Sequence, residues 1–285
     1  MYDLHIHTTH SSDGQHTPGE VLDMARRIGL AGLSFTDHMA VSAVPEGMRL
    51  AEEHGVRFFP GVELSTIREG AEYHLLLYGF RHDEATLQDF LSHYCDAIWG
   101  RLGRAIAIFS RMGFTLGEED IRDWGRSVPT GVTLLDALLV RNRGDARLRD
   151  YVCGSKASSP YLSFYQDYAL GDIGDAVREV LPGLTETLAL FRGLGVTVLA
   201  HPGGVSEGFL AELRAQGLDG IEAYSTHHDE GTSKRLARAA RELGLLVSAG
   251  SDFHGERIKP GIRLGDCPGA PDDALIAALG ERCPY

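Results

Sequence analysis

Short apolar runs that end in metal-binding types of side chain constrain the fold of this chain more than any other feature. These runs end in Asp-Leu-His-Ile-His, Ser-Phe-Thr-Asp-His, Pro-Gly-Val-Glu, Val-Leu-Ala-His-Pro and Ala-Gly-Ser-Asp-Phe-His. At or near such run ends the chain offers nine imidazole or carboxylate side chains: His5, His7, Asp13, His38, Glu63, His74, His201, Asp252 and His254. Enzymes of the α/β class keep their chemistry at strand ends, because a rigid sheet or barrel fixes side chains there. The pattern therefore indicates an α/β metallohydrolase.

The rest of the body alternates between strand-like and helix-like segments. We expect strands at residues 2–6, 31–36, 56–64, 73–80, 196–200, 220–224 and 245–249. We expect helices at residues 18–28, 45–54, 184–194, 207–216 and 230–243. Thr17 is expected to cap the first of these helices, with Glu20 at its third position. Strands separated by helices predict a parallel sheet, and about seven of them favour a barrel.

Residues 82–182 interrupt this alternation. Their pattern is helical, lacks strands and is rich in Arg, which predicts an inserted helical cap subdomain on a barrel formed by residues 1–81 and 183–285. Arg101, Arg104, Arg143 and Lys156 are candidates for contacts to a distal phosphate or base of a substrate. A solvated helical face is the alternative interpretation of these side chains.

Charge and composition exclude several classes of protein. The chain has 285 residues and a formal net charge of −13, which argues against binding an extended nucleic-acid duplex or an anionic membrane. No apolar stretch approaches the roughly 20 residues of a membrane span, and the N-terminal residues lack a signal region. Four scattered cysteines have neither zinc-type nor redox-type spacing. We therefore expect a cytoplasmic protein with a small substrate; its oligomeric state is unknown.

The spacing of the candidate ligands predicts their chemistry. His5 and His7 are two residues apart on an extended segment, so they point to one face and grip one ion, and Asp252 and His254 repeat this geometry. Divalent ions lower the pKa of bound water from about 15.7 to about 7, which supplies a hydroxide at neutral pH. A hydroxide bridging two ions would attack a phosphorus atom in line, while the ions neutralise the phosphate oxygens.

Nine short motifs match one known family. They are Asp3-Leu-His-Ile-His7, Ser12-Asp-Gly14, Thr17-Pro18, Phe35-Thr-Asp-His38, Gly61-Val-Glu63, Tyr73-His74, Ala200-His-Pro202, Gly220-Ile-Glu222 and Gly250-Ser-Asp-Phe-His254. With them the chain resembles the PHP family, named for polymerase and histidinol phosphatase domains, and especially its stand-alone metal-dependent phosphoesterases. The resemblance implies a distorted (β/α)7 barrel with three divalent ions. Mn2+ or Zn2+ is expected, and Fe2+ also suits such ligands.

The resemblance also implies how the ligands are shared. His5, His7, Glu63 and Asp252 would hold one ion. Glu63 would bridge to a second ion held by His74 and His201. The third ion would be held by Asp13, His38 and His254.

Other polar residues near the ligands are expected to assist. Asp3, Asp37 and Glu222 lie at or next to strand positions and would orient the ligands without binding the ions; for Asp37 a helix-capping role is equally favoured. His227 and His228 follow a predicted strand at the same end. We expect His227 to contact substrate, and His228 to act with Asp13, Glu63 and Asp252 in catalysis.

The leading interpretation is a phosphoesterase acting on a small phosphorylated metabolite, a nucleotide or a sugar phosphate. A cyclic sugar phosphodiesterase, a histidinol phosphatase and a short-oligonucleotide exonuclease of the same family stay open. Nucleotide-cleaving relatives place Arg and His together in the insertion, whereas Gly131-Val-Thr-Leu134 supplies neither, which argues against a nucleoside bisphosphate.

Two interpretations from other classes are less favoured. An amidohydrolase that cleaves C–N bonds would carry a carbamylated Lys at a strand end, and none of Lys156, Lys234 and Lys259 has that position. A non-catalytic metal-binding module should have lost ligands, yet all nine are present.

Overall fold

The first sheet follows the predicted alternation closely. The computed structural model describes residues 1–122, 127–169 and 171–283. β1 (Tyr2–Ile6), β2 (Gly32–Phe35) and β3 (Arg57–Phe58) pair in parallel in that order, connected by α1 (Pro18–Ile28) and α2 (Val44–His54). α1 begins at the predicted cap: the Thr17 side chain accepts from Glu20 N, and the Glu20 carboxylate accepts from Thr17 N at 2.8 Å.

The second sheet contains a reversal that the sequence prediction missed. Its order is β4 (Gly61–Arg68), β5 (Ala71–Tyr78), β6 (Val196–Leu199), β7 (Gly220–Ser225) and β8 (Leu246–Gly250). The last three strands are parallel and are connected by α11 (Glu207–Gln216) and α12 (Glu230–Leu243), but β5 runs antiparallel to both neighbours. The predicted all-parallel sheet is therefore wrong at β5. Glu69 and Gly70, with φ of 52° and 80°, form a two-residue hairpin turn that needs no crossover helix.

The predicted strand at 56–64 is two strands in different sheets. Phe59 N still donates to Leu33 O at 2.9 Å, whereas Pro60 O accepts from Gly79 N at 2.9 Å on the other side. Pro60 has no N–H with which to continue the first ladder, so the chain changes sheets at this residue.

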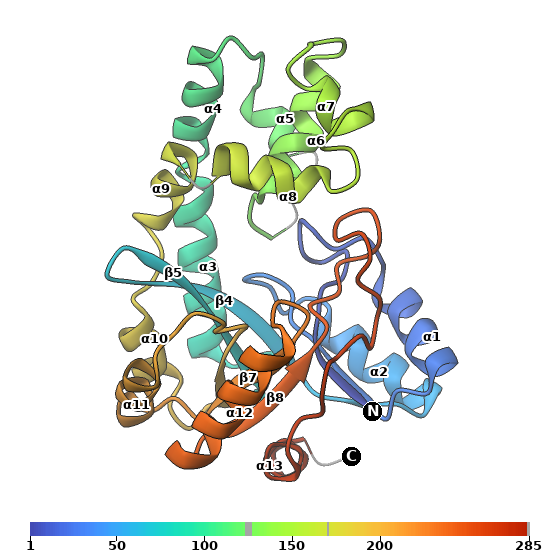
Figure 1. Ribbon diagram of the computed structural model, residues 1–285, viewed down its shortest axis with the longest axis vertical. Coiled ribbons are helices and arrows are strands. Elements are labelled where there is room, and N and C mark those ends of the chain that lie inside the picture. The colour runs from blue at the N-terminus through green and yellow to red at the C-terminus, as the bar shows by residue number, and fades with distance from the viewer. Residues whose placement is uncertain (123–126, 170, 284–285) are drawn as a thin grey trace.

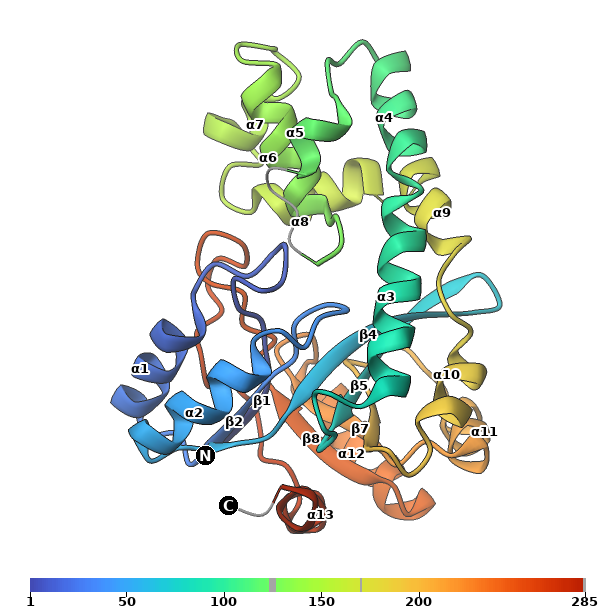
Figure 2. The same ribbon diagram turned by 180° about the vertical axis from the view of Figure 1, so that it is seen from behind.

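The two sheets meet at both margins. Isolated bridges connect Ile6 at the end of β1 to Phe253 after β8, and His38 after β2 to Glu63 on β4. Helices α1, α2, α10 (Leu184–Phe191), α11 and α12 cover the sheets on the outside, which gives the expected mixed α/β body (Figures 1 and 2). The ends of β1, β2, β6 and β8 consequently gather in one place beside β4.

A helix that the sequence analysis did not anticipate packs at the bottom of the body. α13 (Asp273–Arg282) buries Leu275 and Leu279 in a cluster with Leu4 and Tyr78. Figure 1 places it on the side of the body that faces away from the helical upper part. No helix among the described residues is long and apolar enough to cross a membrane.

Most of the helices between β5 and β6 lie above the body, and those from Leu102 to Arg178 are here called the cap (Figures 1 and 2). α3 (Ala85–Trp99) still packs on the main core, whereas a separate apolar cluster runs from Leu102 to Ile173. The elements of this cap are α4 (Leu102–Arg111), α5 (Glu118–Arg122), α6 (Gly131–Arg141), α7 (Arg149–Cys153), α8 (Pro160–Phe164), a π-helix (Tyr165–Ala169) and α9 (Asp172–Arg178). Ile258, from the loop after β8, joins the cap cluster.

Candidate metal centre

The Glu63 carboxylate is the middle of the candidate site. Its side chain on β4 is 1% exposed. Five imidazoles lie within 3.2 Å of its two oxygens: His5, His7, His38, His74 and His201. His5 lies on β1 and His74 lies within β5, whereas His7, His38 and His201 follow the ends of β1, β2 and β6.

Three of these side chains and Asp252 are arranged as ligands of a single divalent ion. His5 Nε2 and His7 Nε2 lie 3.2 and 3.1 Å from Glu63 Oε2 and 3.4 and 3.2 Å from Asp252 Oδ1. Both nitrogens and Asp252 Oδ1 are buried without a hydrogen-bond partner. Ligands about 2.0–2.2 Å from a tetrahedral ion are about 3.3–3.6 Å apart, so these unpaired atoms lie close to the spacing of a coordination sphere.

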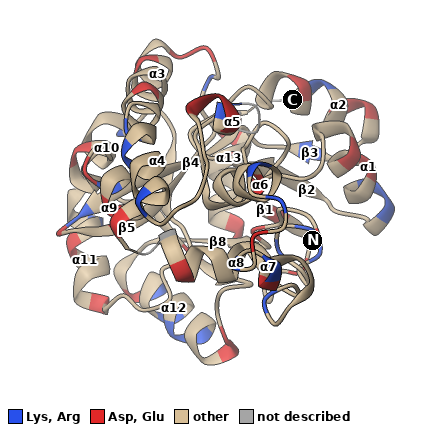
Figure 3. Ribbon diagram, turned by 90° about the horizontal axis from the view of Figure 1, so that it is seen from above, with Lys and Arg blue, Asp and Glu red and all other residues tan. Residues whose placement is uncertain are grey.

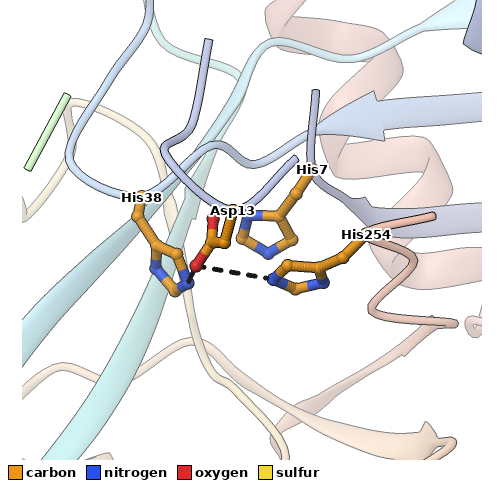
Figure 4. A group of neighbouring side chains, drawn as sticks. All are labelled: His7, Asp13, His38 and His254. Atoms are coloured by element: carbon orange, nitrogen blue, oxygen red, sulfur yellow. Dashed lines mark ion pairs between the residues drawn. The ribbon is translucent and has the colours of Figure 1, made fainter. Parts of the chain in front are cut away.

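A second group lies around Asp13 (Figure 4). Asp13 Oδ2 is 3.5 Å from His38 Nε2 and 3.9 Å from His254 Nε2, and the His7 ring stacks on the His254 ring with centroids 3.9 Å apart. His254 Nδ1 donates to the Asp252 backbone carbonyl at 2.9 Å, which leaves Nε2 directed to Asp13. The residues expected to share one ion are therefore together, with His7 beside them.

A third group uses the other oxygen of Glu63. Oε1 lies 2.8 Å from His74 Nδ1 and 3.2 Å from His201 Nε2. One possible ligand atom from each of His38, Glu63 and His74 also lies within 4.8 Å of the other two. The three predicted groups thus overlap more than the sequence indicated, because His7 and His38 each face two of them.

Burial and charge oppose each other throughout this centre. Burial favours the protonated form of Glu63, yet the imidazoles of His5, His38 and His74 hold its pKa well below the ordinary value. Burial lowers the pKa of His7 and His74, but neighbouring carboxylates outweigh it and raise these values to about 9 and about 10. For His38 burial prevails and lowers the pKa to about 4. Protons on His7 and His74 thus occupy positions where metal ions would bring positive charge.

Two candidate ligands have strained backbones. His201 and Asp252 have φ of 31° and 53°, in the left-handed region that non-glycine residues rarely adopt. Such strain costs about 1–3 kcal/mol per residue and persists where the surroundings force it. In this chain the left-handed backbone directs the side chains of His201, after β6, and Asp252, after β8, toward the candidate metal centre.

Glu222 on β7 orients two of the imidazole residues. Its Oε1 accepts from His5 Nδ1 at 3.0 Å, which fixes the tautomer that leaves His5 Nε2 free, and its Oε2 accepts from His201 N at 2.8 Å. A side chain at Gly250 would place its Cβ 2.2 Å from His5 Cβ, so β8 passes β1 closely enough to hold this arrangement only with glycine there.

Asp3 and Asp37 position backbone next to the ligands. Asp3 accepts from Ser251 N at 2.9 Å and Ser251 Oγ at 2.6 Å, immediately before Asp252. Asp37 accepts from Thr8 N at 2.6 Å and Thr8 Oγ1 at 2.8 Å, immediately after His7. Burial is the main cause that raises the pKa of Asp37 to about 7. Its carboxylate serves Thr8 rather than the first turn of a helix.

The two histidines after β7 have different surroundings. His227 is 42% exposed, and its Nε2 lies 2.6 Å from Asp252 Oδ2. His228 instead uses Nδ1 to donate to the Ala223 carbonyl at 3.1 Å. Lys259 contacts the same Asp252 oxygen as His227. Sequence reasoning missed Lys259 as a site residue, although a lysine seven residues after a ligand in a chain with three lysines is a usable signal.

Three of the four cationic candidates of the cap pair with nearby carboxylates. Arg104 Nη1 and Arg101 Nη2 lie 2.5 and 3.8 Å from Glu179 Oε2, next to α9. Lys156 Nζ lies 2.5 Å from Asp167 Oδ2, and Arg143 is exposed in the turn after α6. Figure 3 shows Lys and Arg scattered among Asp and Glu over the outer helices. A substrate contact by any of these four residues stays a prediction.

A cleft of about 570 Å³ opens beside His74 and His201. Tyr73 and Phe209 line it, with their rings stacked at a centroid distance of 5.1 Å, and Tyr165 of the cap lines it as well. Glu72 is the acidic residue of its lining, which includes neither Lys nor Arg among the described residues. The cleft therefore presents mainly aromatic and neutral polar groups next to the metal centre.

Comparisons with known proteins agree with this site. The family model described as PHP domain matches residues 3–95. The chain is 26% identical over 268 residues to phosphoribosyl 1,2-cyclic phosphate 1,2-diphosphodiesterase of Eggerthella lenta, covering 89% of this chain and 94% of that protein. It is 28% identical over 259 residues to 3',5'-nucleoside bisphosphate phosphatase of Chromobacterium violaceum, covering 88% of this chain and 86% of that protein.

A solved structure extends the likeness to the whole fold. A Bifidobacterium adolescentis protein assigned as a metal-dependent phosphoesterase superposes with a TM-score of 0.78 at 26% identity, covering 99% of this chain and 96% of that one. Fold and site together define a metal-dependent phosphoric ester hydrolase. The PHP domain that the motifs predicted is thus matched over residues 3–95, and relatives and a solved structure resemble the chain over most of its length.

Proposed function

We propose that this chain hydrolyses a phosphate ester of a small metabolite, a nucleotide or a sugar phosphate, with three divalent ions held by the nine predicted ligands. Mn2+ or Zn2+ is the proposed metal, since both suit mixed imidazole and carboxylate ligands. The observation that carries the proposal is the set of overlapping groups around Glu63, in which buried atoms of His5, His7, His38 and Asp252 lack hydrogen bonds. The bridges between the two sheets support a distorted (β/α)7 barrel as the scaffold.

Different side chains have different roles in the proposed reaction. When bound, the ions lower the pKa of water and neutralise phosphate oxygens. Glu63, Asp13 and Asp252 supply the negative charge that keeps several cations close together. Glu222 fixes the His5 ring. We assign proton donation to the departing alkoxide to His227 rather than His228, because the exposed His227 ring lies 4.8 Å from that of His201.

The cleft beside His74 supports a substrate whose alcohol part carries a flat ring. Tyr73, Phe209 and Tyr165 offer aromatic surface, and one base stacked on an aromatic side chain contributes about 1–3 kcal/mol. Glu72 and the lack of Lys or Arg in the described lining disfavour a second phosphate in this cleft. A nucleoside monophosphate therefore fits better than a bisphosphate, and the cyclic sugar phosphate named for the Eggerthella relative is the second candidate.

Phosphate release from AMP and from ribose 5-phosphate tests this choice, because the two share the sugar and the phosphate and differ in the base. We expect kcat/KM of the Mn2+-loaded protein to be about tenfold higher for AMP, and Phe209→Leu to remove most of the difference. Leu162→Ala, which truncates an exposed cap side chain outside the cleft, is the control. Equal rates for both esters, or faster cleavage of ribose 1,2-cyclic phosphate, would reassign the substrate to the sugar phosphates.

A further inference from the structure

Lys259 places a positive charge at the rim of the metal centre. Its ammonium group contacts Asp252 Oδ2, the oxygen that faces away from His5 and His7, and its side chain is 27% exposed. An ammonium group has three donors, and Asp252 takes one of them. The others remain for a ligand that enters from solvent, without any need to break the contact with Asp252.

The backbone of residues 255–259, here called the arm, fixes where Lys259 lies. Ile258 N and Lys259 N both donate to the Gly255 carbonyl, at 3.1 and 2.9 Å, so the arm is a tight turn. Gly255 has a φ of 96°, and a Cβ there would lie 2.4 Å from Gln15 Cβ. Gln15 Oε1 in turn accepts from Arg257 N at 2.8 Å, so the arm is fastened to the loop that carries Asp13.

The same arm is anchored in the cap. Arg257 donates from both terminal nitrogens to Asp136 of α6, at 3.2 and 3.0 Å, and also contacts the Tyr161 hydroxyl of α8. Asp136 is 7% exposed, and Ile258 packs in the apolar cluster of the cap. Asp136 is buried and Arg257 is half exposed, and such a bidentate pair specifies geometry more strongly than a single contact between two exposed groups. The position of Lys259 therefore depends on how the cap is seated.

We propose that Lys259 is a catalytic residue that donates a hydrogen bond from its ammonium group to a non-bridging oxygen of the substrate phosphate. The Arg257–Asp136 pair holds it in place for this contact. This inference rests on the proposed phosphoesterase function, and it couples the seating of the cap to binding of the phosphate itself. It differs from the sequence-based expectation, in which the cations of the cap reach only distal parts of the substrate.

The test compares Lys259→Met with Lys234→Met, a matched control in an exposed pair with Glu230 on α12. In the metal-loaded protein we expect Lys259→Met to lower kcat/KM for p-nitrophenyl phosphate about tenfold to a hundredfold, the usual effect of losing a hydrogen bond to a charged group. The inhibition constant of inorganic phosphate should rise by about the same factor. Lys259→Arg should recover part of the loss, and metal content should stay unchanged.

A second pair of variants tests the arm. Arg257→Gln should lower kcat/KM about threefold to tenfold, whereas Arg147→Gln, which removes a cap arginine paired with Asp145, should leave it unchanged. Unchanged kinetics of Arg257→Gln would overturn the coupling to the cap.

Other outcomes of the Lys259→Met experiment would contradict the proposed role of Lys259. Loss of metal together with activity in Lys259→Met would show that Lys259 supports Asp252 and does not bind phosphate, and kinetics equal to those of the wild type would exclude any role. If the metal-loaded wild type releases phosphate from no ester, the proposed function fails. Calorimetric binding of inorganic phosphate to wild type and Lys259→Met then still decides whether Lys259 binds a phosphate oxygen.

Discussion

The metal-centre end of the body and the helical cap use charged side chains in opposite ways. In the body, Glu63 is 1% exposed among five imidazoles, and several ligand atoms lack hydrogen bonds. In the cap, pairs such as Arg104–Glu179 have both partners 53% exposed. A partner removed from a buried ionic group costs about 3–5 kcal/mol, whereas an exposed pair contributes about 0–1 kcal/mol. The body thus contains buried charged groups that are arranged to bind cations, whereas the outer face of the cap carries charge in exposed pairs.

The largest expected effect comes from the middle of the body. Glu63→Ala removes the carboxylate that all five imidazoles face, so the protein should retain at most one ion and lose activity about 10³-fold or more. Asp13→Ala and His254→Ala should each remove about one ion. Elemental analysis of protein purified with Mn2+ or Zn2+ measures these contents, with close to three ions expected in the wild type. One ion or none in active wild-type protein would refute the three-ion centre.

A smaller effect should separate the two ends of the body. Asp37 and Asp219 make the same contacts, each accepting from the N–H and hydroxyl of one threonine, Thr8 and Thr197 respectively. Asp37 lies beside His7, whereas Asp219 lies at the start of β7, away from the strand ends that carry the ligands. Asp37→Asn should lower activity or metal affinity about 10- to 100-fold, because it disturbs the backbone that presents His7.

Asp219→Asn is the matched control for that experiment. It should leave activity per folded molecule unchanged, as measured by kinetics together with thermal unfolding. Similar activity losses in the two variants would show that Asp37 acts only on stability.

The smallest effect is expected on the outer surface of the cap. Because Arg104 pairs with Glu179 between α4 and the end of α9, Arg104→Ala should change kcat/KM less than about twofold and the free energy of unfolding by about 0–1 kcal/mol. Kinetics with AMP and with p-nitrophenyl phosphate check this expectation. A KM that rises only for AMP would restore the sequence-based assignment of Arg104 to substrate binding and weaken the contrast between cap and body.

Local sequence signals predicted much of the fold. The bounds of α11 and α12 are those expected, because Ser206 and Asp229 cap their first turns and Gly217 and Gly244 end them. The nine candidate ligands were proposed from a related local signal, because residue type and the predicted end of a strand together suggest a position even when the neighbouring strand is unknown.

Contacts between distant segments left no such signal. The reversal at β5 depends on a single Glu69–Gly70 turn, and its flanking strands match a parallel pattern equally well. Arg257 and Asp136 are 121 residues apart in the chain, and no local sequence pattern around either residue predicts their ion pair. The anchoring of the loop that carries Lys259 in the cap could therefore not be predicted from the sequence.

The left-handed backbone of His201 and Asp252 sets stability against activity in this protein. Glycine adopts such a φ without steric cost and brings no buried charge or imidazole, so His201→Gly and Asp252→Gly would relax the chain locally. The same substitutions would delete two of the nine ligands. Mutational drift, or engineering guided by thermostability alone, would favour the loss of these side chains. Only selection for turnover keeps His201 and Asp252 at positions where their backbone is strained.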